Sequence, residues 1–387
     1  MRHCRPVRRP WWLAVGAFLS VVACNTAGLN NAPSGGNNSD PLCTDDEENC
    51  TSSTPDAGKK KDAGTSSDGG TTPNSTGITI LVAPGTLYND INAAIRSAKT
   101  SVHVTMYLLT DSRVIDSLGD MVDAGKDVKV VLNRNFPSNG GDDDSGNNNT
   151  SINQLKARGV KVKWASTTAF NYTHAKTIVI DGEKALISTM NMSFSSPTSN
   201  REFVAIDTDP QDVADCEKLF EADYADGADG TSNPLEIASK LVISPAAANT
   251  NGSPQTMLKD FIASAQTSLD VEVQSLSDSG IYNAIIAKKK EGVPTRVILA
   301  KYDNTLASST SVKALVAAGV EVKALGTPTM HAKSVVVDKA HVWVGSQNFT
   351  TNALTRNREV GLFTSDADAI AKVEEAIDTD WARAAAP

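Results

Sequence analysis

The chain has 387 residues, of which 40% are hydrophobic and 21% are charged, and its formal net charge is −9. This length is enough for two domains, and the composition is that of an ordinary soluble globular protein. The negative balance disfavours a general nucleic-acid binder that works by neutralising phosphates.

The N-terminal segment predicts export. Residues 1–10 are basic, and residues 11–23 form an apolar run that is too short to span a bilayer comfortably. The run ends in "VVAC", which resembles the lipobox of bacterial lipoproteins, whose cysteine, here Cys24, is lipidated and becomes the mature N-terminus. An ordinary secretory signal cut nearby is the alternative. We therefore expect residues 1–23 to be a lipoprotein signal peptide and the exported protein to lie in a bacterial cell envelope, lipid-anchored to a membrane.

Residues 24–76 predict a disordered tether. Gly, Ser, Asn, Asp and Thr dominate this stretch, as in "SGGNNSDP", and such a composition cannot bury enough apolar surface to offset its ordering entropy. Cys43 and Cys50 lie within it, and export favours a small disulfide loop between them. Cys216 lies in the helical pattern "PQDVADCEKLFEADYA" and is expected in the core.

From residue 77 strand and helix patterns alternate, and they do so twice in the same order. The first series reads "GITILVAPG", "LYNDINAAIRSAK", "SVHVTMYLL", "SRVIDSLGDMVDAG", "DVKVVLN", "SINQLKARG", "VKVKWAS" and "HAKTIVID". The second reads "KLVISPA", "QTMLKDFIASAQ", "SLDVEVQSL", "SGIYNAIIAKKKEG", "TRVILAK", "SVKALVAAG", "VEVKALG" and "HAKSVVVD". Alternation of this kind predicts an α/β fold with mixed, mainly parallel sheets covered by helices on both faces, built once in residues 77–232 and again in residues 233–387.

One loop of the first half, residues 135–151, has no counterpart of equal length in the second half. It reads "NFPSNGGDDDSGNNNTS", and its Asp run suggests calcium, but the spaced ligands and terminal Glu of a calcium loop are missing. We therefore predict no metal site there.

Polar residues repeat between the halves at a fixed spacing. When His174 is aligned with His331, five further pairs also lie 157 positions apart: Lys176 and Lys333, Asp181 and Asp338, Asn191 and Asn348, Asn200 and Asn357, and Glu202 and Glu359. A repeat kept only for packing would preserve apolar periodicity and not polar identities. The spacing therefore indicates a shared chemistry.

Residues two apart on a strand share a face, so His174 and Lys176 are expected to point the same way, as are His331 and Lys333. An imidazole beside an ammonium suits a phosphate ester, because the lysine can bind non-bridging oxygens while the histidine attacks or protonates. A metal site is a poorer interpretation, since a lysine repels a cation and is not a usual ligand.

The acidic residues of the repeat have two expected roles. Asp181 and Asp338 complete the catalytic motif, but each lies an odd number of residues after its histidine, so we interpret them as strand-end anchors more than as reactants. Glu202 and Glu359 are the better candidates to accept the histidine Nδ1–H, which would fix the tautomer with Nε2 toward phosphorus.

Small and hydroxyl residues follow each aspartate closely, in "ALISTMNMSFSSPTSNREF" and "VWVGSQNFTTNALTRNREV". Small residues let the backbone approach an anion, and hydroxyls and amides can bond its oxygens. Thr189 and Asn191, with Ser346 and Asn348, are the predicted phosphate-binding residues. His103 and His341, outside the motif, are expected to be structural.

The pattern H-x-K-x-x-x-x-D, followed by a Gly-Ser-x-Asn-like turn and an Asn-x-Glu, resembles the phospholipase D superfamily. The resemblance runs from residue 77 to the C-terminus, with motif segments at 168–195 and 325–352. It implies two α/β/α sandwich halves related by a pseudo-twofold axis, with one active site between them. It also implies a two-step phosphoryl transfer that needs no metal and no cofactor.

By the same resemblance, His174 would be the nucleophile that forms a phosphohistidine, and His331 the acid that protonates the leaving alcohol. One departure is "STMN" where the second copy has "GSQN": Ser188 stands for the usual glycine and Thr189 for the usual serine. Activity is still expected, with an altered shape of the first phosphate pocket.

The superfamily includes phospholipases, phosphatidyl transferases, nucleases and inactive scaffolds. A lipid anchor and tether favour a phospholipid substrate, and no transmembrane pattern follows the signal, which disfavours an integral synthase. We therefore predict a monomeric phospholipase D-like enzyme that hydrolyses headgroup phosphodiester bonds. The alternatives are a metal-independent nuclease or phosphodiesterase acting on nucleic acid, and a catalytically silent binding scaffold. Headgroup choice, and hydrolysis versus transfer to an alcohol, stay open.

Overall fold

The computed structural model describes residues 77–136, 147–227, 235–245, 252–301 and 306–387, and all of these belong to one structural unit. Several predicted features lie outside the described residues: the signal peptide, Cys24, the tether with Cys43 and Cys50, residues 137–146 of the acidic loop, and the predicted boundary between the halves at residues 232 and 233.

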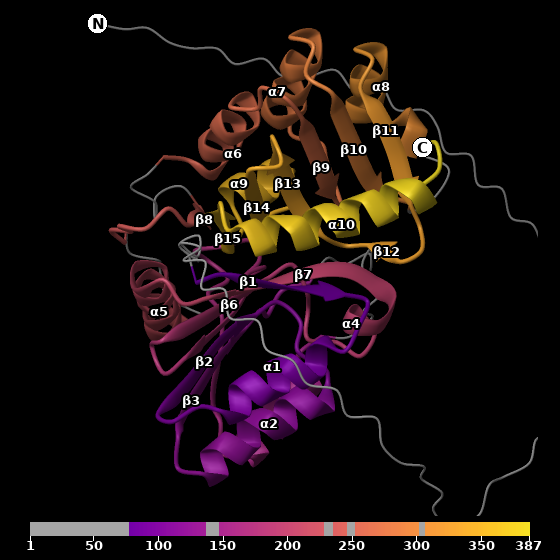
Figure 1. Ribbon diagram of the computed structural model, residues 1–387. Helices are drawn as coiled ribbons and strands as arrows, with labels where there is room; N and C mark the ends of the chain where they lie inside the picture. The colour runs from indigo at the N-terminus through magenta and orange to yellow at the C-terminus, as the bar shows by residue number, and fades with distance from the viewer. Residues whose placement is uncertain (1–76, 137–146, 228–234, 246–251, 302–305) are drawn as a thin grey trace, which may run out of the picture. The chain divides into compact units, whose positions relative to one another are not determined.

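The elements of the first half, in chain order, are β1 (Thr79–Ala83), α1 (Leu87–Arg96), β2 (Ser101–Met106), α2 (Ser112–Asp123), β3 (Asp127–Leu132), α3 (Asn149–Ala157), β4 (Lys161–Trp164), β5 (Lys176–Ile180), β6 (Lys184–Ser188), α4 (Ser196–Ser199), β7 (Asn200–Asp207) and α5 (Pro210–Asp226). They follow the predicted order of strands and helices. The sequence after β5 supplies two further strands, β6 and β7, before the closing helix (Figure 1).

The second half repeats this order with β8 (Val242–Ser244), α6 (Pro254–Ala263), β9 (Leu269–Val273), α7 (Ser279–Lys290), β10 (Thr295–Ala300), a 3-10 turn (Leu306–Ser308), α8 (Thr310–Ala317), β11 (Glu321–Leu325), β12 (Thr329–Met330), β13 (Lys333–Val337), β14 (His341–Gly345), α9 (Thr351–Thr355), β15 (Glu359–Thr364) and α10 (Ala367–Arg383). The duplication predicted from the spacing of 157 residues is therefore present in the fold.

Both sheets are mixed, and they share one strand order. The first runs β1-β7-β6-β5-β2-β3-β4 and the second runs β8-β15-β14-β13-β9-β10-β11. In each sheet the last three strands pair in parallel, while the other neighbours pair antiparallel. The mixed α/β class is confirmed, although parallel pairing is less extensive than expected. The reason is local: β5–β6 and β13–β14 are hairpins, and a short turn can only return the chain antiparallel.

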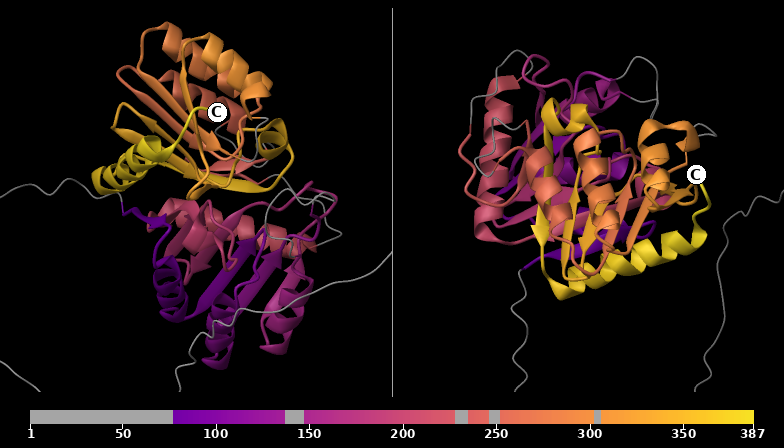
Figure 2. Two further views of the ribbon diagram at one scale, coloured as in Figure 1. Left: turned by 90° about the vertical axis from the view of Figure 1, so that its right-hand side faces the viewer. Right: turned by 90° about the horizontal axis from the view of Figure 1, so that it is seen from above.

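Helices cover both faces of each sheet, and the strand period of two decides which side chains meet them. In β13, Val335 and Val337 pack in the apolar cluster of α6, α7 and α8, whereas Val336 packs with α10. Figure 2 shows α6, α7 and α8 together on one side of the second sheet, with α10 apart from them. The cluster around Val336 also contains Ile187 and Phe203 of the first sheet. One continuous core therefore joins the two halves.

Aspartate caps fix where the major helices start. Asp209 accepts hydrogen bonds from two backbone N–H groups at the start of α5, and Asp366 does the same for α10. Asp111 and Asp278 cap α2 and α7, each accepting a hydrogen bond from one backbone N–H. Capping of this type satisfies helix N–H groups that have no partner within the helix, so it stabilises each helix at its first turn.

Short strand pairings between the halves bring the two motif segments together. β12, from the second half, pairs in parallel with Asn200 and Arg201 at the start of β7 (Figure 1). Thr173 forms the equivalent parallel bridge with Arg358. Each histidine motif is thus preceded by backbone that is hydrogen-bonded to the Asn-Arg-Glu segment of the opposite half.

Candidate active site

Each motif lysine is buried at the start of a central strand. Lys176 begins β5 and Lys333 begins β13, with 1% and 0% of their surface exposed. Each Nζ donates a hydrogen bond back to the carbonyl oxygen of the histidine two residues earlier, over 2.6 Å to His174 and 2.5 Å to His331. The two residues of each pair therefore lie together, as the spacing of two predicts.

Each histidine is paired with a glutamate of the other half. His174 Nδ1 lies 2.8 Å from Glu359 Oε2, and His331 Nδ1 lies 2.7 Å from Glu202 Oε1. Both carboxylates are completely buried. With a carboxylate as acceptor, Nδ1 carries the proton and Nε2 remains for chemistry. The predicted histidine-orienting residues thus lie against the histidines, and the pairing crosses between the halves.

The asparagines of the repeat support these glutamates. Asn357 Nδ2 donates to Glu359 Oε1 over 3.1 Å, and Asn200 Nδ2 donates to Glu202 Oε1 over 3.2 Å. A buried carboxylate is stable only when its oxygens are hydrogen-bonded or paired with charge. These amides supply part of that requirement at each copy.

The two hydroxyl residues predicted to bind phosphate are engaged with the neighbouring strand. Thr189 Oγ1 donates to Glu202 Oε2 over 2.5 Å and accepts from the Phe203 backbone N–H over 2.9 Å. Ser346 Oγ accepts from the Val360 backbone N–H over 3.0 Å. Thr189 in this arrangement supports the glutamate that holds His331.

The two asparagines predicted to bind phosphate each have an unpaired side-chain oxygen. Asn191 Oδ1 and Asn348 Oδ1 are buried without a hydrogen-bond partner. Asn348 Nδ2 donates to Gln274 Oε1 over 3.2 Å. Buried polar atoms are rarely left unsatisfied in native proteins, so these amides are suited to contact a polar ligand.

The motif aspartates lie at the far end of the strands from the histidines. Asp181 accepts hydrogen bonds from the backbone N–H groups of residues 99–101, and Asp338 does so from residues 266–268. Burial opposes ionisation, but these donors outweigh it and lower the pKa of each carboxyl to about 2. Each lies seven positions after its histidine, beyond a strand of five residues, which separates the two by roughly 20 Å. This geometry places them as anchors of the strand ends and away from the reacting groups.

The electrostatics of His174 favour the neutral imidazole. Burial lowers the pKa of His174 to about 4, even though Glu359 acts in the opposite direction, and the charges of Lys176 and Lys333 lower it further. Lys333 belongs to the other half, so the two motifs are close enough to act on each other. At Glu202, burial would raise the pKa, but His331 and the nearby donors outweigh it and lower the pKa.

Some residues of the site were not among those predicted from the sequence. The Tyr107 ring lies edge-on to His174 with centroids 4.7 Å apart, and Lys176 Nζ lies 5.1 Å from the centre of that ring. Tyr107 follows β2, and Gln274 follows β9 at the equivalent position. Aligning "SVHVTMYLL" with "SLDVEVQSL" would have shown both. Arg201 and Arg358 were also missed, although each stands between the repeated Asn and Glu.

A second polar cluster lies on the α5 face of the first sheet. His103 stacks on Phe220 with centroids 4.7 Å apart, and its Nδ1 lies 2.5 Å from Glu217. With Glu221 they form the one group of three metal-ligating side chains among the described residues. Lys129 already pairs with Glu221 at 2.7 Å, so the cluster balances its charge internally. His341 Nδ1 lies 2.6 Å from Ser365 Oγ at the surface, and Cys216 is buried in the core.

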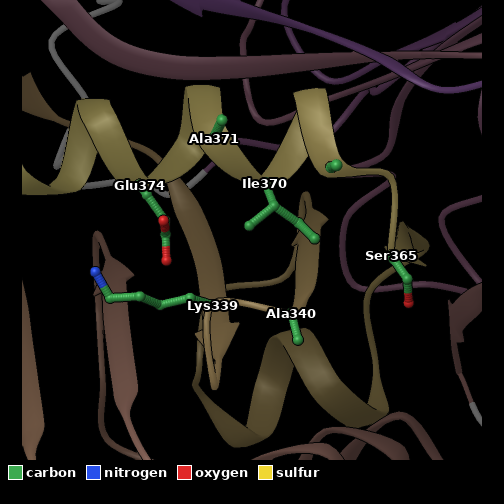
Figure 3. Close-up of a pocket in the computed structure, with 7 residues that line it drawn as sticks. Lys339, Ala340, Ser365, Ile370, Ala371 and Glu374 are labelled. Atoms are coloured by element: carbon green, nitrogen blue, oxygen red, sulfur yellow. The ribbon is translucent and has the colours of Figure 1, made fainter. Parts of the chain in front are cut away.

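A pocket of about 290 Å³ lies between the β13–β14 turn and α10 (Figure 3). It is lined by Lys339, Ala340, Ser365, Ala367, Ile370, Ala371 and Glu374. Burial raises the pKa of Glu374, and Lys339 opposes this effect. The pocket adjoins Asp338, at the strand end opposite His331, so it is separate from the histidine–glutamate pairs.

Comparison with known proteins gives a family match across both halves. A family model described as "Cardiolipin synthase, PLD-like domain" matches residues 91–224 and 258–381. A cardiolipin synthase of Oceanobacillus iheyensis is 23% identical over 348 residues, covering 79% of this chain and 69% of that protein. None of the helices in the described ranges combines the length and the apolarity that a bilayer crossing requires.

Two further relatives differ in extent. A mitochondrial cardiolipin hydrolase of Chlamydomonas reinhardtii is 28% identical over 123 residues, or 32% of this chain, and the chain spans only 55% of that protein. The crystal structure of phosphatidylserine synthase from Haemophilus influenzae superposes with a TM-score of 0.59 over 80% of this chain and 87% of that one, at 14% identity. This second likeness shows a shared two-half fold.

Proposed function

The chain belongs to the family described as "Cardiolipin synthase, PLD-like domain", and on that premise we propose that it is a phospholipase D-like enzyme that hydrolyses the headgroup phosphodiester bond of phospholipids. The observation that carries this proposal is the crossed pairing of His174 with Glu359 and of His331 with Glu202. Two oriented imidazoles from opposite halves supply a nucleophile and an acid for one phosphodiester.

In the first step, His174 Nε2 attacks phosphorus and the bond to the leaving alcohol breaks. The attacking nitrogen must be unprotonated, and the low pKa of His174 keeps it so. Positive charge then develops on the imidazole, and Glu359 stabilises it through the Nδ1–H. His331 gives its Nε2 proton to the departing oxygen, and Glu202 supports the protonated form that precedes this transfer.

In the second step, water replaces the histidine. His331, now neutral, takes a proton from the water molecule as the water oxygen bonds to phosphorus and the bond to His174 Nε2 breaks. The product is a phosphate monoester, His174 is again neutral and His331 is again protonated. The same intermediate could pass to an alcohol instead of water, which would transfer the phosphatidyl group.

The two buried lysines supply positive charge at the reaction centre. Lys176 and Lys333 lie against the two histidines, where ammonium groups stabilise the charge that builds on the non-bridging oxygens in the transition state. We therefore propose that the reaction proceeds without a divalent ion.

A lipid substrate and an anchor at Cys24 form part of the same proposal. The names of the relatives, cardiolipin synthase and cardiolipin hydrolase, support a phospholipid. A lipidated N-terminus followed by the polar stretch of residues 24–76 would hold the enzyme in the cell envelope at a high effective concentration near its substrate. Cys24→Ser should then move the protein from the membrane fraction to the soluble exported fraction.

The test is direct assay of the protein with EDTA present. Phospholipid vesicles and single- and double-stranded DNA are offered separately, and headgroup release and strand cleavage are measured. Headgroup release from vesicles in EDTA supports the proposal. Cleavage of DNA alone would identify a nuclease, a strict need for added divalent ion would contradict the metal-free mechanism, and no reaction with either would favour a silent scaffold.

A further inference from the structure

Two buried arginine–aspartate pairs lie behind the active site. Arg201 Nη2 donates to Asp380 Oδ1 over 2.8 Å, with a second bond from Nε. Arg358 Nη2 donates to Asp223 Oδ1 over 2.9 Å, and its Nε also donates to that carboxylate. All four residues have at most 5% of their surface exposed. Bidentate, buried pairs of this kind fix geometry more firmly than surface ion pairs do.

Both pairs cross between the halves, and both follow the internal repeat. Arg201 and Arg358 are 157 residues apart, and so are Asp223 and Asp380. Arg201 Nη1 also donates to the Ala83 carbonyl oxygen, and Arg358 Nη1 donates to that of Ser244 over 3.1 Å. The repeat therefore preserves an arginine contact that joins each half to the other, in addition to the histidine motif.

Each arginine precedes the glutamate that orients a histidine. Neighbouring residues on a strand point to opposite faces, so Arg358 reaches Asp223 on one side while Glu359 reaches His174 on the other. Both contacts are made to the first half. The same holds for Arg201 and Glu202, which reach Asp380 and His331 of the second half.

The arginine backbones also hold the histidine backbones. The N–H groups of His174 and Ala175 both donate to the Arg358 carbonyl oxygen over 2.8 Å, and the Arg358 N–H donates to the Tyr172 carbonyl oxygen over 2.9 Å. In the other copy, the His331 N–H donates to the Arg201 carbonyl oxygen over 3.3 Å. A shift of either arginine would therefore move a histidine and its glutamate together.

We infer that Arg201 and Arg358 are positioning residues, each for a different histidine. Arg358, held by Asp223, positions His174 for attack. Arg201, held by Asp380, positions His331 for proton transfer. The inference rests on the proposed roles of the two histidines. Displacement of a reacting group by about 1 Å can lower a rate about 100-fold. Loss of either arginine–aspartate pair, Arg358–Asp223 or Arg201–Asp380 (the two clamps), should therefore act on one histidine selectively.

The effects of the two clamps can be distinguished by assaying two substrates that differ in leaving group. Arg358→Lys and Asp223→Asn disturb the nucleophile, so they should lower kcat by the same factor, about 10- to 100-fold, on a natural alkyl phosphodiester and on a p-nitrophenyl phosphodiester. Arg201→Lys and Asp380→Asn disturb the acid, so they should lower kcat on the alkyl ester by that factor and leave the p-nitrophenyl ester within about threefold of wild type, because a good leaving group needs little protonation.

A second bidentate arginine pair within the second half provides the control. Arg296 pairs with Asp270, with Nε 2.6 Å from Oδ1, and it is not adjacent to an orienting glutamate. Its side chain is 27% exposed and also pairs with Asp378 of α10, so it controls for the chemical change and not for full burial. Arg296→Lys makes the same chemical change and should leave kcat on both substrates unchanged. If it lowers activity as the clamp variants do, a general loss of stability explains their effect and the inference fails.

Histidine imidazole NMR keeps the inference testable apart from catalysis. In long-range 1H–15N spectra, Arg358→Lys should shift the Nδ1 signal of His174 and leave that of His331 unchanged, and Arg201→Lys should do the reverse. An inactive wild type would contradict the proposed function, while these selective shifts would still support the clamps. Equal shifts at both histidines, or shifts at neither, would overturn the inference. Asp223→Glu and Asp380→Glu, which keep the charge, replace any lysine variant that fails to fold by circular dichroism.

Discussion

His174 and His331 occupy equivalent positions in the two halves, yet the residues around them differ. His174 lies against the Tyr107 ring, and burial lowers its pKa to about 4. At the place of Tyr107 the second half has Gln274, which bonds to Asn348. The internal repeat thus preserves both histidines and their lysines, while the aromatic ring of Tyr107 in one half is replaced by an amide at the equivalent position of the other. An aromatic neighbour favours the neutral imidazole that the proposed nucleophile needs, and an amide at the equivalent position suits the proposed proton donor.

The largest expected effect comes from removing one histidine at a time. His174→Asn removes the atom that we propose bonds to phosphorus, so turnover should stop on every substrate. His331→Asn removes the proposed general acid; such a group typically contributes about 10²–10⁴-fold, and less for a good leaving group. It should therefore still cleave a p-nitrophenyl ester once, fail on an alkyl ester, and accumulate phosphoenzyme on His174, located by mass spectrometry. Covalent label on His331 in the His174→Asn variant would reverse the two assignments.

A smaller effect on kcat is expected from removing the hydroxyl group of Thr189 or Ser346. Thr189 donates to Glu202, so Thr189→Val leaves a buried carboxylate with one donor fewer, at a cost of about 1–3 kcal/mol. We expect about a 10-fold loss of kcat on an alkyl ester. Ser346→Ala, at the equivalent position of the other copy, removes an acceptor for the Val360 N–H and should change kcat less. Thr189→Ser serves as the control; a loss there as large as for valine would rule out the hydroxyl as the cause.

The pH profile tests the effect of the Tyr107 ring on the pKa of His174. A neutral His174 is required for attack, so the acid limb of kcat/KM should lie near pH 4, where its pKa lies. Tyr107→Gln admits polar contacts, which should raise the pKa of His174 toward 6.5 and lower activity several-fold at pH 5 but not at pH 8. Gln274→Tyr makes the reverse change at the equivalent position of the second half and should leave the acid limb in place. An acid limb near pH 6.5 in the wild type would contradict the neutral, buried nucleophile.

The smallest expected effect is on stability, and it concerns Glu272, a carboxyl beside the Arg201–Asp380 clamp. Glu272 lies beside Asp380 in the second half, and burial together with Asp380 raises the pKa of Glu272 well above its usual value. A group whose folded pKa is raised favours the folded state below its unfolded pKa, near 4.5, and loses that benefit as pH rises toward the folded pKa. Glu272→Gln cannot ionise, so its melting temperature should exceed that of wild type by a few degrees at pH 8 and match it at pH 4. Equal melting temperatures at both pH values would show that Glu272 ionises freely.

The sequence was sufficient for the fold class, because the alternation of strands and helices and the spacing of 157 residues are local properties of the chain. It also placed Lys176 and Lys333 beside their histidines, since two residues on a strand share a face. Asp181 and Asp338 were expected to anchor the strand ends, and they do lie there because a whole strand separates each from its histidine. Their pKa of about 2 reflects backbone donors at the strand ends.

Features that depend on contact between the halves could not be predicted in this way. No spacing along the chain says whether Glu359 serves His331 or His174, because that depends on β12 and Thr173 pairing with the opposite half. The same contacts make Arg201 and Arg358 structural partners of distant aspartates. Thr189 was predicted to bind phosphate, and its bond to Glu202 became visible only with β6 and β7 side by side.

The crossed histidine–glutamate pairs also imply that both halves must be together for the proposed reaction to occur. Each histidine depends on a carboxylate from the other half, so neither half contains a complete catalytic set by itself. Separate subunits carrying one motif each would have to associate, and their activity per chain would fall on dilution. Here the two sets are covalently joined, and the local concentration of one half around the other is fixed by the peptide chain. Activity per molecule should therefore be independent of enzyme concentration, and a chain cut between α5 and β8 should keep its activity only while the buried contacts hold the pieces together.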